Sequence, residues 1–293
     1  MKKFYLFIAA ISLALCFHEE TFIGAKNGLI LWYQTIIPSL LPFILITNAL
    51  SETQSHLPAL TILNRLLPGK SYPLFSLLLG NLCGYPLGGK IINDFAKSGT
   101  IGSDYANKLL AVASQASPMF LVGYVHNHIL NEELPLSIFL SSIYIPNILL
   151  FMLISRKQHS TSSFVTPHKI SSPMISDTFL HSVQIITIIG IYMILFSILF
   201  EILLPYCKPA STKIILSFTE ITTGINLLTT LVVSKPIKIA LICALSTFGG
   251  VSSALQVKYV LSYPNATIKK YLLHKITLSA GTFLIIYSYY ILT

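Results

Sequence analysis

Long apolar runs alternate with short polar connections along most of the chain. Runs without a charged residue cover residues 27–51, 71–89, 109–131, 134–155, 178–200, 239–257 and 276–293. A helix needs about 20 mainly apolar residues to cross the hydrocarbon layer of a bilayer. The pattern therefore predicts an all-α, polytopic membrane protein.

Several of these runs are interrupted by glycine, proline or polar residues. The interruptions lie at Gly84–Gly89, at Ser117-Pro118, around Glu220 and at Gly249-Gly250. Lipid cannot satisfy open backbone groups, so such segments persist at bilayer depth only inside protein or beside a watery cavity. Interrupted segments at corresponding places in two halves point to the substrate site of a transporter.

The order of the segments predicts two structural repeats. A continuous helix, a broken segment, a broken helix and a continuous helix follow one another in residues 27–155, and again in 178–293. We expect four parts: an N-terminal anchor helix (1–26), a first repeat (27–155), a hydrophilic linker (156–177) and a second repeat (178–293). Residues 1–17 also resemble a signal peptide without a small-x-small cleavage site, so a cleaved signal is the alternative to the anchor helix.

The first broken segment of each repeat, at 71–95 and 214–233, either crosses the membrane or turns back. Two segments that turn back give inverted repeats, whereas two that cross give parallel repeats. With a cytoplasmic N-terminus, turning back keeps Arg65, Lys97 and Arg156 inside, as the positive-inside rule prefers. We therefore favour re-entrant segments, although this leaves Lys208 and Lys235 outside.

Composition strengthens the membrane prediction and excludes several functional classes. Of the 293 residues, 54% are hydrophobic and 10% are charged, with a mean hydropathy of +0.74; soluble domains carry about 25% charged residues. The net charge of +9 is spread over the connections, which favours contact with anionic lipid heads over nucleic acid. The four cysteines are far apart and no HExxH or GxSxG motif occurs. We therefore expect no metal, no cofactor and no enzymatic activity.

The first-half candidates for a solute site surround two interruptions. Glycines at the first interruption create a half-helix whose free N–H groups attract an anion, with Lys90 as a partner charge. The alternatives are a close helix contact through Gly84 and Gly88, and a Lys90 that reaches the membrane surface. At the second interruption, polar side chains either face the solute or bond a neighbouring helix. The candidates are Gly84, Tyr85, Gly88, Gly89, Lys90, Ser114, Gln115 and Ser117.

The second half adds a carboxylate. Glu220 is the acidic residue well inside an apolar segment, and a charge there costs about 2.5–3.5 kcal/mol, so it is a functional hypothesis by default. It would bind a coupling proton or accept hydrogen bonds from a sugar or amine; the alternative is a helix cap. The candidates are Glu220, Thr222, Asn226, Gly249, Gly250, Ser252 and Gln256.

These motifs resemble the YlbJ-type sporulation integral membrane proteins, within the nucleoside-recognition or Gate domain group. The resemblance rests on residues 27–43, 80–90, 114–120, 220–228 and 248–257, in family order. The sequence departs from the family pattern at two places, and both bear on which substrate is bound. The Ser-Gly-Tyr-Pro run of the family is replaced by Cys83-Gly84-Tyr85-Pro86, and its Asn-rich run is replaced by Ser114-Gln115-Ala116. The resemblance implies Gate-type repeats, kinship with nucleoside transporters and, for the sporulation branch, movement of dipicolinic acid.

Together these observations predict a transporter of a small anionic or nucleoside-like solute, in a bacterial cell or forespore membrane. Its expected partners are the solute and membrane lipids. The alternative is a non-transporting scaffold for a sporulation or envelope complex.

Overall fold

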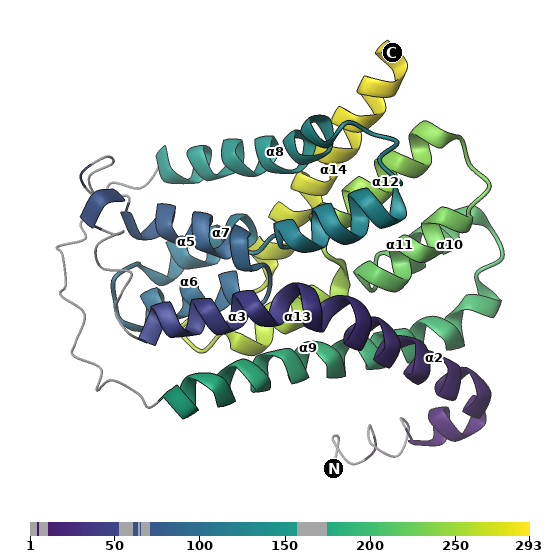
Figure 1. The fold of residues 1–293 in the computed structure, drawn as a ribbon, viewed down its shortest axis with the longest axis horizontal. Coiled ribbons are helices and arrows are strands. Elements are labelled where there is room, and N and C mark those ends of the chain that lie inside the picture. Colours follow the sequence, from purple (N-terminus) through teal and green to yellow (C-terminus); the bar gives the residue numbers. More distant parts are fainter. Residues whose placement is uncertain (1–4, 6–10, 53–60, 64, 66–70, 157–174) are drawn as a thin grey trace.

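The fold of the protein is all-helical throughout the part that the structure describes. The computed structural model describes residues 5, 11–52, 61–63, 65, 71–156 and 175–293 (Figure 1). Five helical stretches in this part are long and apolar enough to cross a membrane: His18–Ile46, Leu136–Arg156, Ser182–Tyr206, Lys235–Val260 and Lys269–Leu292. The predicted fold class is confirmed. Most of the expected linker, residues 157–174, and residues 1–4 and 6–10 of the expected anchor lie outside the described residues.

Residues 18–52 form one long rod rather than two helices. Helix α2 (His18–Leu31) continues through a π-helical segment, η1 (Trp32–Ile36), into α3 (Ile37–Glu52). Pro38 is the second residue of α3. A proline removes a backbone donor and clashes with the carbonyl four residues earlier, here within η1, which accounts for the wider turn. A helix end between residues 26 and 27 is therefore wrong, because this point falls inside α2; the division into an anchor and a first repeat stays a prediction.

The rod packs closely on α9 (Ile175–Leu203), which ends in a short 3₁₀ turn, η3 (Leu204–Tyr206). Gly24 and Gly28 lie one helical turn apart on the contact face. A Cβ on Gly24 would come within 2.6 Å of the Ile198 Cα, and one on Gly28 within 2.8 Å of the Ile194 Cα. Small residues at this spacing let helices approach closely in lipid.

Two short helix pairs turn back on themselves. Helices α5 (Ser71–Cys83) and α6 (Leu87–Lys97) form one hairpin, and α10 (Ala210–Ser217) and α11 (Ile221–Thr230) form the other. A Cβ on Gly80 would lie 3.0 Å from the Gly88 Cα, and one on Gly224 would lie 1.9 Å from the Ser217 carbonyl oxygen. Such proximity between residues seven or eight apart requires a reversal of the chain, as the re-entrant alternative expects. Figure 1 shows the two hairpins at opposite ends of the bundle.

A broken helix follows each hairpin. Helix α7 (Ser103–Ala113) stops before residues 114–117, and the chain continues as a π helix, η2 (Phe120–Ile129). Helix α12 (Lys235–Phe248) is separated from α13 (Gly250–Val260) by Gly249 alone. The hairpin and broken helix thus recur in the same order, and the two-repeat interpretation stays a prediction.

Two long helices complete the bundle. They are α8 (Leu136–Arg156) and α14 (Lys269–Leu292), which pack on each other and on α12. The expected start of the last helix at residue 276 is wrong. Helix α14 begins at Lys269, so Lys275 lies inside it.

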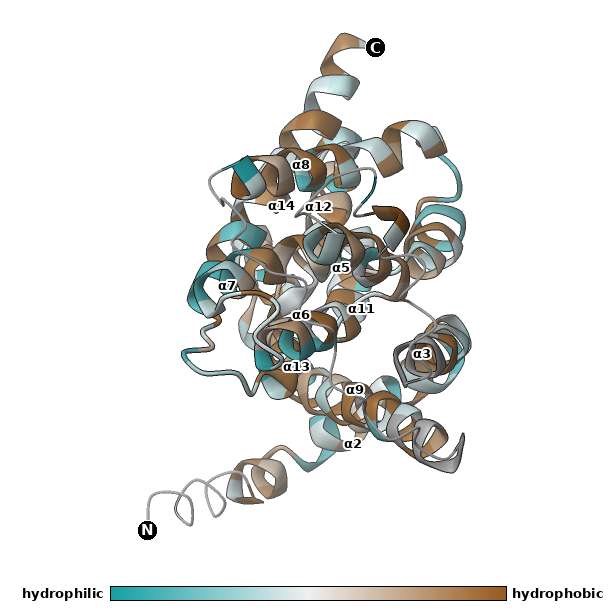
Figure 2. Ribbon diagram, turned by 90° about the vertical axis from the view of Figure 1, so that its left-hand side faces the viewer, coloured by the Kyte–Doolittle hydropathy of each residue, from teal (hydrophilic) through white to brown (hydrophobic). Residues whose placement is uncertain are grey.

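The outer faces of the bundle are apolar. Figure 2 shows hydrophobic residues on rim helices such as α8 and α9, and large exposed side chains there include Leu149, Leu153, Ile191 and Leu195. A water-soluble monomer rarely exposes so wide an apolar surface. The chain is an integral membrane protein, and these faces contact lipid.

Candidate functional site

The four predicted interruptions meet at the centre of the bundle. The Tyr85 N–H donates to the Gln115 carbonyl (3.1 Å), which joins the first break to the second. The Val251 N–H donates to the Phe218 carbonyl (3.0 Å), which joins the fourth break to the third. A Cβ on Gly249 would lie 3.2 Å from Cε1 of Tyr85, so the fourth break also touches the first.

Glycine permits two of these breaks. Gly84 has φ +81°, and Gly249 and Gly250 have φ +86° and +81°. Residues with a side chain rarely adopt this left-handed region. The backbone therefore changes direction at these points without a side chain in the way.

A small cavity lies where the breaks meet. Its volume is about 30 Å³, which is room for water but far below the roughly 300–1,000 Å³ of a typical ligand pocket. All four breaks or their adjoining helices contribute to its wall. The lining residues are Ile36, Leu40, Gly84, Tyr85, Ala116, Ser117, Phe120, Ile189, Met193, Glu220, Ile221 and Gln256.

Glu220 is both a cavity-lining acid and a helix cap. It precedes α11 in an extended conformation and is 4% exposed. Its carboxylate accepts hydrogen bonds from the Thr223 N–H (2.9 Å) and from the hydroxyls of Thr222 (2.8 Å) and Thr223 (3.0 Å). The N-terminal end of a helix favours negative charge. The helix-cap interpretation of Glu220 is confirmed, and its role in binding a proton or a solute stays a prediction. Thr222 bonds the acid and is not part of the cavity wall.

Two polar side chains line the cavity beside Glu220. The Ser117 hydroxyl accepts a hydrogen bond from the Phe120 N–H (3.3 Å) at the start of η2. The Gln256 amide donates to the Ser252 hydroxyl (3.2 Å). Its Oε1 is buried and has no hydrogen-bond partner among the described residues, so an acceptor is left over next to the cavity.

Other predicted site residues have packing roles. A Cβ on Gly88 would lie 1.8 Å from the Ala113 carbonyl oxygen, and one on Gly89 would lie 3.0 Å from Val257. Gly88 therefore makes the close contact that the packing alternative expects, and Gly89 also packs closely; a role of either glycine in a solute site stays a prediction. Ser114 is fully buried and does not line the cavity.

Two further residues that were predicted to belong to the site lie outside the cavity wall. Lys90 is half-buried on α6 and is absent from the cavity wall, which removes the expected positive charge beside the solute. Asn226 is exposed on α11, where it accepts a hydrogen bond from the Tyr124 hydroxyl (3.1 Å).

The sequence analysis missed a buried polar network behind the cavity. Lys275, with no exposed surface, donates to Oε1 of Gln115 (2.8 Å) and to the Thr247 carbonyl (3.0 Å). The Gln115 amide donates to Asn147 (3.1 Å), which in turn donates to Asn81 (3.1 Å). Gln115 thus belongs to this network, and its side chain does not line the cavity.

A sequence signal for Lys275 does exist. Tyr271, Lys275, Leu278 and Thr282 recur at helical spacing and all are buried, which is the pattern of one helix face turned inward. The burial of Lys275 was not predicted, because a charged residue at the edge of an apolar run usually marks the membrane boundary.

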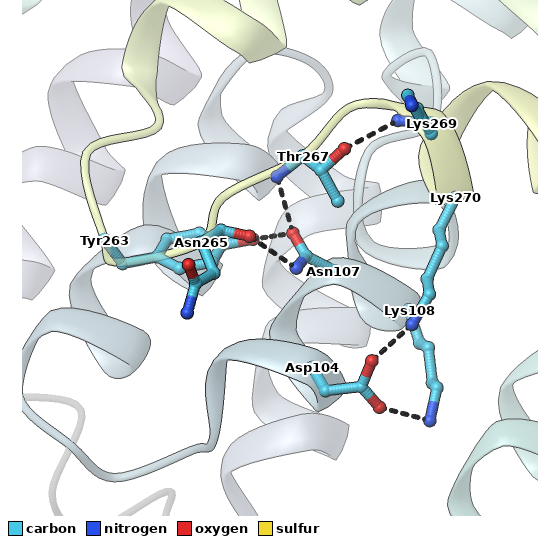
Figure 3. Close-up of polar contacts among 8 residues, drawn as sticks. All are labelled: Asp104, Asn107, Lys108, Tyr263, Asn265, Thr267, Lys269 and Lys270. Atoms are coloured by element: carbon cyan, nitrogen blue, oxygen red, sulfur yellow. Dashed lines mark hydrogen bonds and ion pairs between the residues drawn. The ribbon is translucent and has the colours of Figure 1, made fainter.

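A second polar cluster connects α7 to the start of α14 at one end of the bundle. Figure 3 shows the connection between α13 and α14 lying against Asn107 of α7. Asn107 accepts hydrogen bonds from the Tyr263 hydroxyl (2.7 Å) and the Thr267 N–H (2.9 Å), and donates to the Asn265 carbonyl (3.0 Å). Nearby, Asp104 pairs with Lys108 and Lys270. This cluster fixes the start of α14 beside α7 and so helps to place Lys275 next to Gln115.

Comparison with known proteins gives one distant relative. The sporulation integral membrane protein YlbJ of Bacillus subtilis (strain 168) is 26% identical over 133 residues, which cover 43% of this chain and 31% of that protein. The similarity thus spans under a third of the relative's length. No family model matches the chain, and no solved structure matches it. The similarity agrees with an integral membrane protein, and membership of the Gate domain group stays a prediction.

Proposed function

We propose that the protein carries a small polar solute across the membrane and binds it where the four breaks meet. The observation that carries this proposal is the buried carboxylate of Glu220, which lies in a cavity between broken helices inside an apolar bundle. Transporters build substrate sites from discontinuous helices of this kind. An ionisable residue held at such depth is expensive unless it has a function.

The lining of the cavity favours a nucleoside-like solute over a dicarboxylate. Glu220 is the charged residue of the lining set, and Tyr85 and Phe120 supply aromatic rings. A base would stack on a ring, while Glu220 and the free Oε1 of Gln256 would accept hydrogen bonds from sugar hydroxyls or an amine. An ionised Glu220 would repel dipicolinate. We therefore revise the predicted preference for an anion, which was based on half-helix N-termini and on Lys90, because Lys90 is not part of the cavity wall.

The cavity must enlarge to admit such a solute. Its volume of about 30 Å³ corresponds to a conformation closed around the site. Opening would separate the breaks, which are held together by the Tyr85–Gln115 and Val251–Phe218 backbone hydrogen bonds. Substrate-driven closure and opening of this kind is a common device in transport and catalysis.

The charge distribution favours one end of the bundle as the cytoplasmic end. Helices α7 and α14 begin, and α8 and α13 end, near the cluster of Figure 3. The basic residues on these helix ends are Lys108, Arg156, Lys258, Lys269 and Lys270. Since cytoplasmic ends carry the excess of Lys and Arg, we assign this end to the cytoplasm of a bacterial cell or forespore. The sporulation role is proposed from the relative's name alone.

Counterflow in liposomes tests the proposal. Purified protein would be reconstituted in vesicles loaded with unlabelled uridine or dipicolinate, and uptake of the same labelled compound would be measured. We expect uridine uptake well above that of empty vesicles, and at least a tenfold loss with Glu220→Gln. Thr230→Ala, on the exposed face of the same helix, is the matched control.

Two outcomes contradict the proposal. One is the absence of flux above empty vesicles for both compounds. The other is a Glu220→Gln protein that transports normally. Loss of abundance in cells without any flux by the wild type would instead favour the scaffold alternative.

A further inference from the structure

Lys275 is a cation enclosed in the middle of a membrane-spanning bundle. It lies on α14, has no exposed surface, and takes part in none of the ion pairs between described residues. Its ammonium has three N–H donors. Two of them are accepted by the Gln115 Oε1 and the Thr247 carbonyl, and the Tyr271 ring lies 5.9 Å away, at cation–π distance.

The protein places this ammonium at the carboxyl ends of two broken helices. Thr247 belongs to the last turn of α12, whose final carbonyls lack partners within the helix. Gln115 lies two residues beyond the end of α7. Helix C-termini carry partial negative charge. The end of α12 presents a backbone carbonyl to Lys275, and the break after α7 presents the side-chain amide oxygen of Gln115. Glu220, in contrast, lies at the N-terminal end of α11.

The surroundings of Lys275 leave its charge uncompensated by any acid. The titratable or charged side chains on α14 and on the helices packed against it are Asp104, Tyr105 and Lys108 on α7; Tyr144 and Arg156 on α8; Lys235, Lys238 and Cys243 on α12; and Lys269, Lys270, Tyr271, His274, Tyr287, Tyr289 and Tyr290 on α14. Of these, Tyr271 lies against the ammonium. Burial without a nearby acid disfavours the charged form of an amine, which makes release of its proton easier.

We propose that Lys275 is the proton carrier of the transport cycle, and that its ammonium occupies the place which a coupling metal cation would take. Half-helix C-termini and unwound carbonyls bind Na⁺ or H⁺ in secondary transporters. Here one such carbonyl, that of Thr247, and the side-chain oxygen of Gln115 hold a lysine. In one step of the cycle an N–H bond of the ammonium breaks, the proton passes to water on the side to which the site is open, and the electron pair stays on the amine. The amine takes up a proton on the opposite side. This inference rests on the proposed transport function.

Gradient-driven uptake in liposomes tests the inference. Wild-type vesicles would be given either a pH gradient or a Na⁺ gradient, and accumulation of uridine would be measured. We expect several-fold accumulation with the pH gradient and none with Na⁺. Lys275→Gln and Lys275→Arg should keep counterflow exchange and lose accumulation, since the amide has no such proton and a guanidinium does not release one. Lys269→Met, an exposed lysine on the same helix, should behave as wild type.

The outcomes separate the two proposals. Absence of wild-type counterflow for both uridine and dipicolinate contradicts the transport function. Counterflow combined with unchanged pH-driven accumulation in the Lys275 variants, or with Na⁺-driven accumulation by the wild type, overturns the role of Lys275 alone.

A comparison of melting temperatures tests the inference without a transport assay, and so remains usable if the Lys275 variants fold poorly. The melting temperature of the detergent-purified wild type would be compared with that of Lys275→Met from pH 6 to pH 9. We expect the wild type to gain stability relative to the variant as the pH rises, because the neutral amine costs less to bury. A difference that stays constant over this range shows that Lys275 does not titrate there and overturns the inference.

Discussion

At the scale of single residues, the predicted site is centred on Glu220. A lone carboxylate in an apolar run is a strong sequence signal because its burial is costly, and the structure places it in the cavity with Gly84, Tyr85 and Ser117. Lys275 gave a weaker signal. Its burial depends on α14 starting at Lys269, and a hydropathy pattern does not determine that start.

Glu220 should contribute to stability as well as to transport. Glu220→Ala removes the acceptor for the Thr223 N–H and for two threonine hydroxyls. Loss of a cap costs about 0.5–2 kcal/mol, so we expect the free energy of unfolding to fall by that amount. Glu220→Gln keeps a carbonyl oxygen for Thr223 and should lose less. Equal losses, measured by thermal unfolding in detergent, would show that capping is not the stabilising contact.

At the scale of elements, the α5–α6 hairpin depends on close packing against the end of α7. Gly80 and Gly88 both face the Ala113 carbonyl. The sequence showed that glycines cluster here, and left two explanations: a solute site or a helix contact. Spacing alone does not decide between them, because the partner of Gly88 is 25 residues away along the chain. The same holds for Gly24 and Gly28, whose spacing by four marks the contact of α2 with α9.

A methyl group at Gly88 should disrupt this hairpin. The new Cβ would lie 1.8 Å from the Ala113 oxygen, and overpacking of this kind typically costs about 1–3 kcal/mol. Gly88→Ala should therefore lower the melting temperature of the purified protein. Gly123→Ala is the matched control, since no atom lies within 4 Å of a Cβ built there. If both variants melt at the same temperature, the close contact at Gly88 is wrong.

At the scale of the whole molecule, contacts between the two halves hold the site together. The order of continuous and broken segments was predictable because interruptions stand out within apolar runs. The contacts that join the halves were not predictable, since nothing in the sequence shows that Asn107 bonds Tyr263 or that Gln115 bonds Lys275. The boundary at residue 27 was misplaced because Glu19, Glu20 and Lys26 read as a polar connection.

At this end of the bundle, the hydrogen bonds of Asn107 should contribute more to stability than the ion pairs of Asp104. Asn107 is 4% exposed and bonds Tyr263, Asn265 and Thr267. Its loss leaves buried groups unpaired, which costs about 1–3 kcal/mol, whereas exposed ion pairs contribute little. Asn107→Ala should therefore lower the melting temperature more than Asp104→Asn does. The reverse order would contradict the structure.

The ion pairs of Asp104 should respond to acid in a defined range. Hydrogen bonds from Lys108 and Lys270 lower the pKa of Asp104 below its ordinary value. A carboxyl of this kind stabilises the folded state above the unfolded pKa of about 3.9 and loses that effect as the pH falls through its folded-state pKa. The stability difference between wild type and Asp104→Asn should stay constant from about pH 8 to 5 and shrink below about pH 4. A difference that changes near pH 7 would point to another group.

The central claim is that the four breaks enclose a polar chamber which water reaches from the membrane faces. Cysteine accessibility tests it most directly: Ser117→Cys, in a background without Cys16, Cys83, Cys207 and Cys243, would be treated with a charged, membrane-impermeant thiol reagent from each side. We predict labelling at Ser117→Cys and its suppression by bound solute. We predict none at Ser142→Cys, a fully buried position on α8 whose carbonyl accepts a hydrogen bond from Thr282 of α14. A Ser117→Cys protein that stays unlabelled from both sides, although folded, would show that the breaks pack dry and would contradict the account.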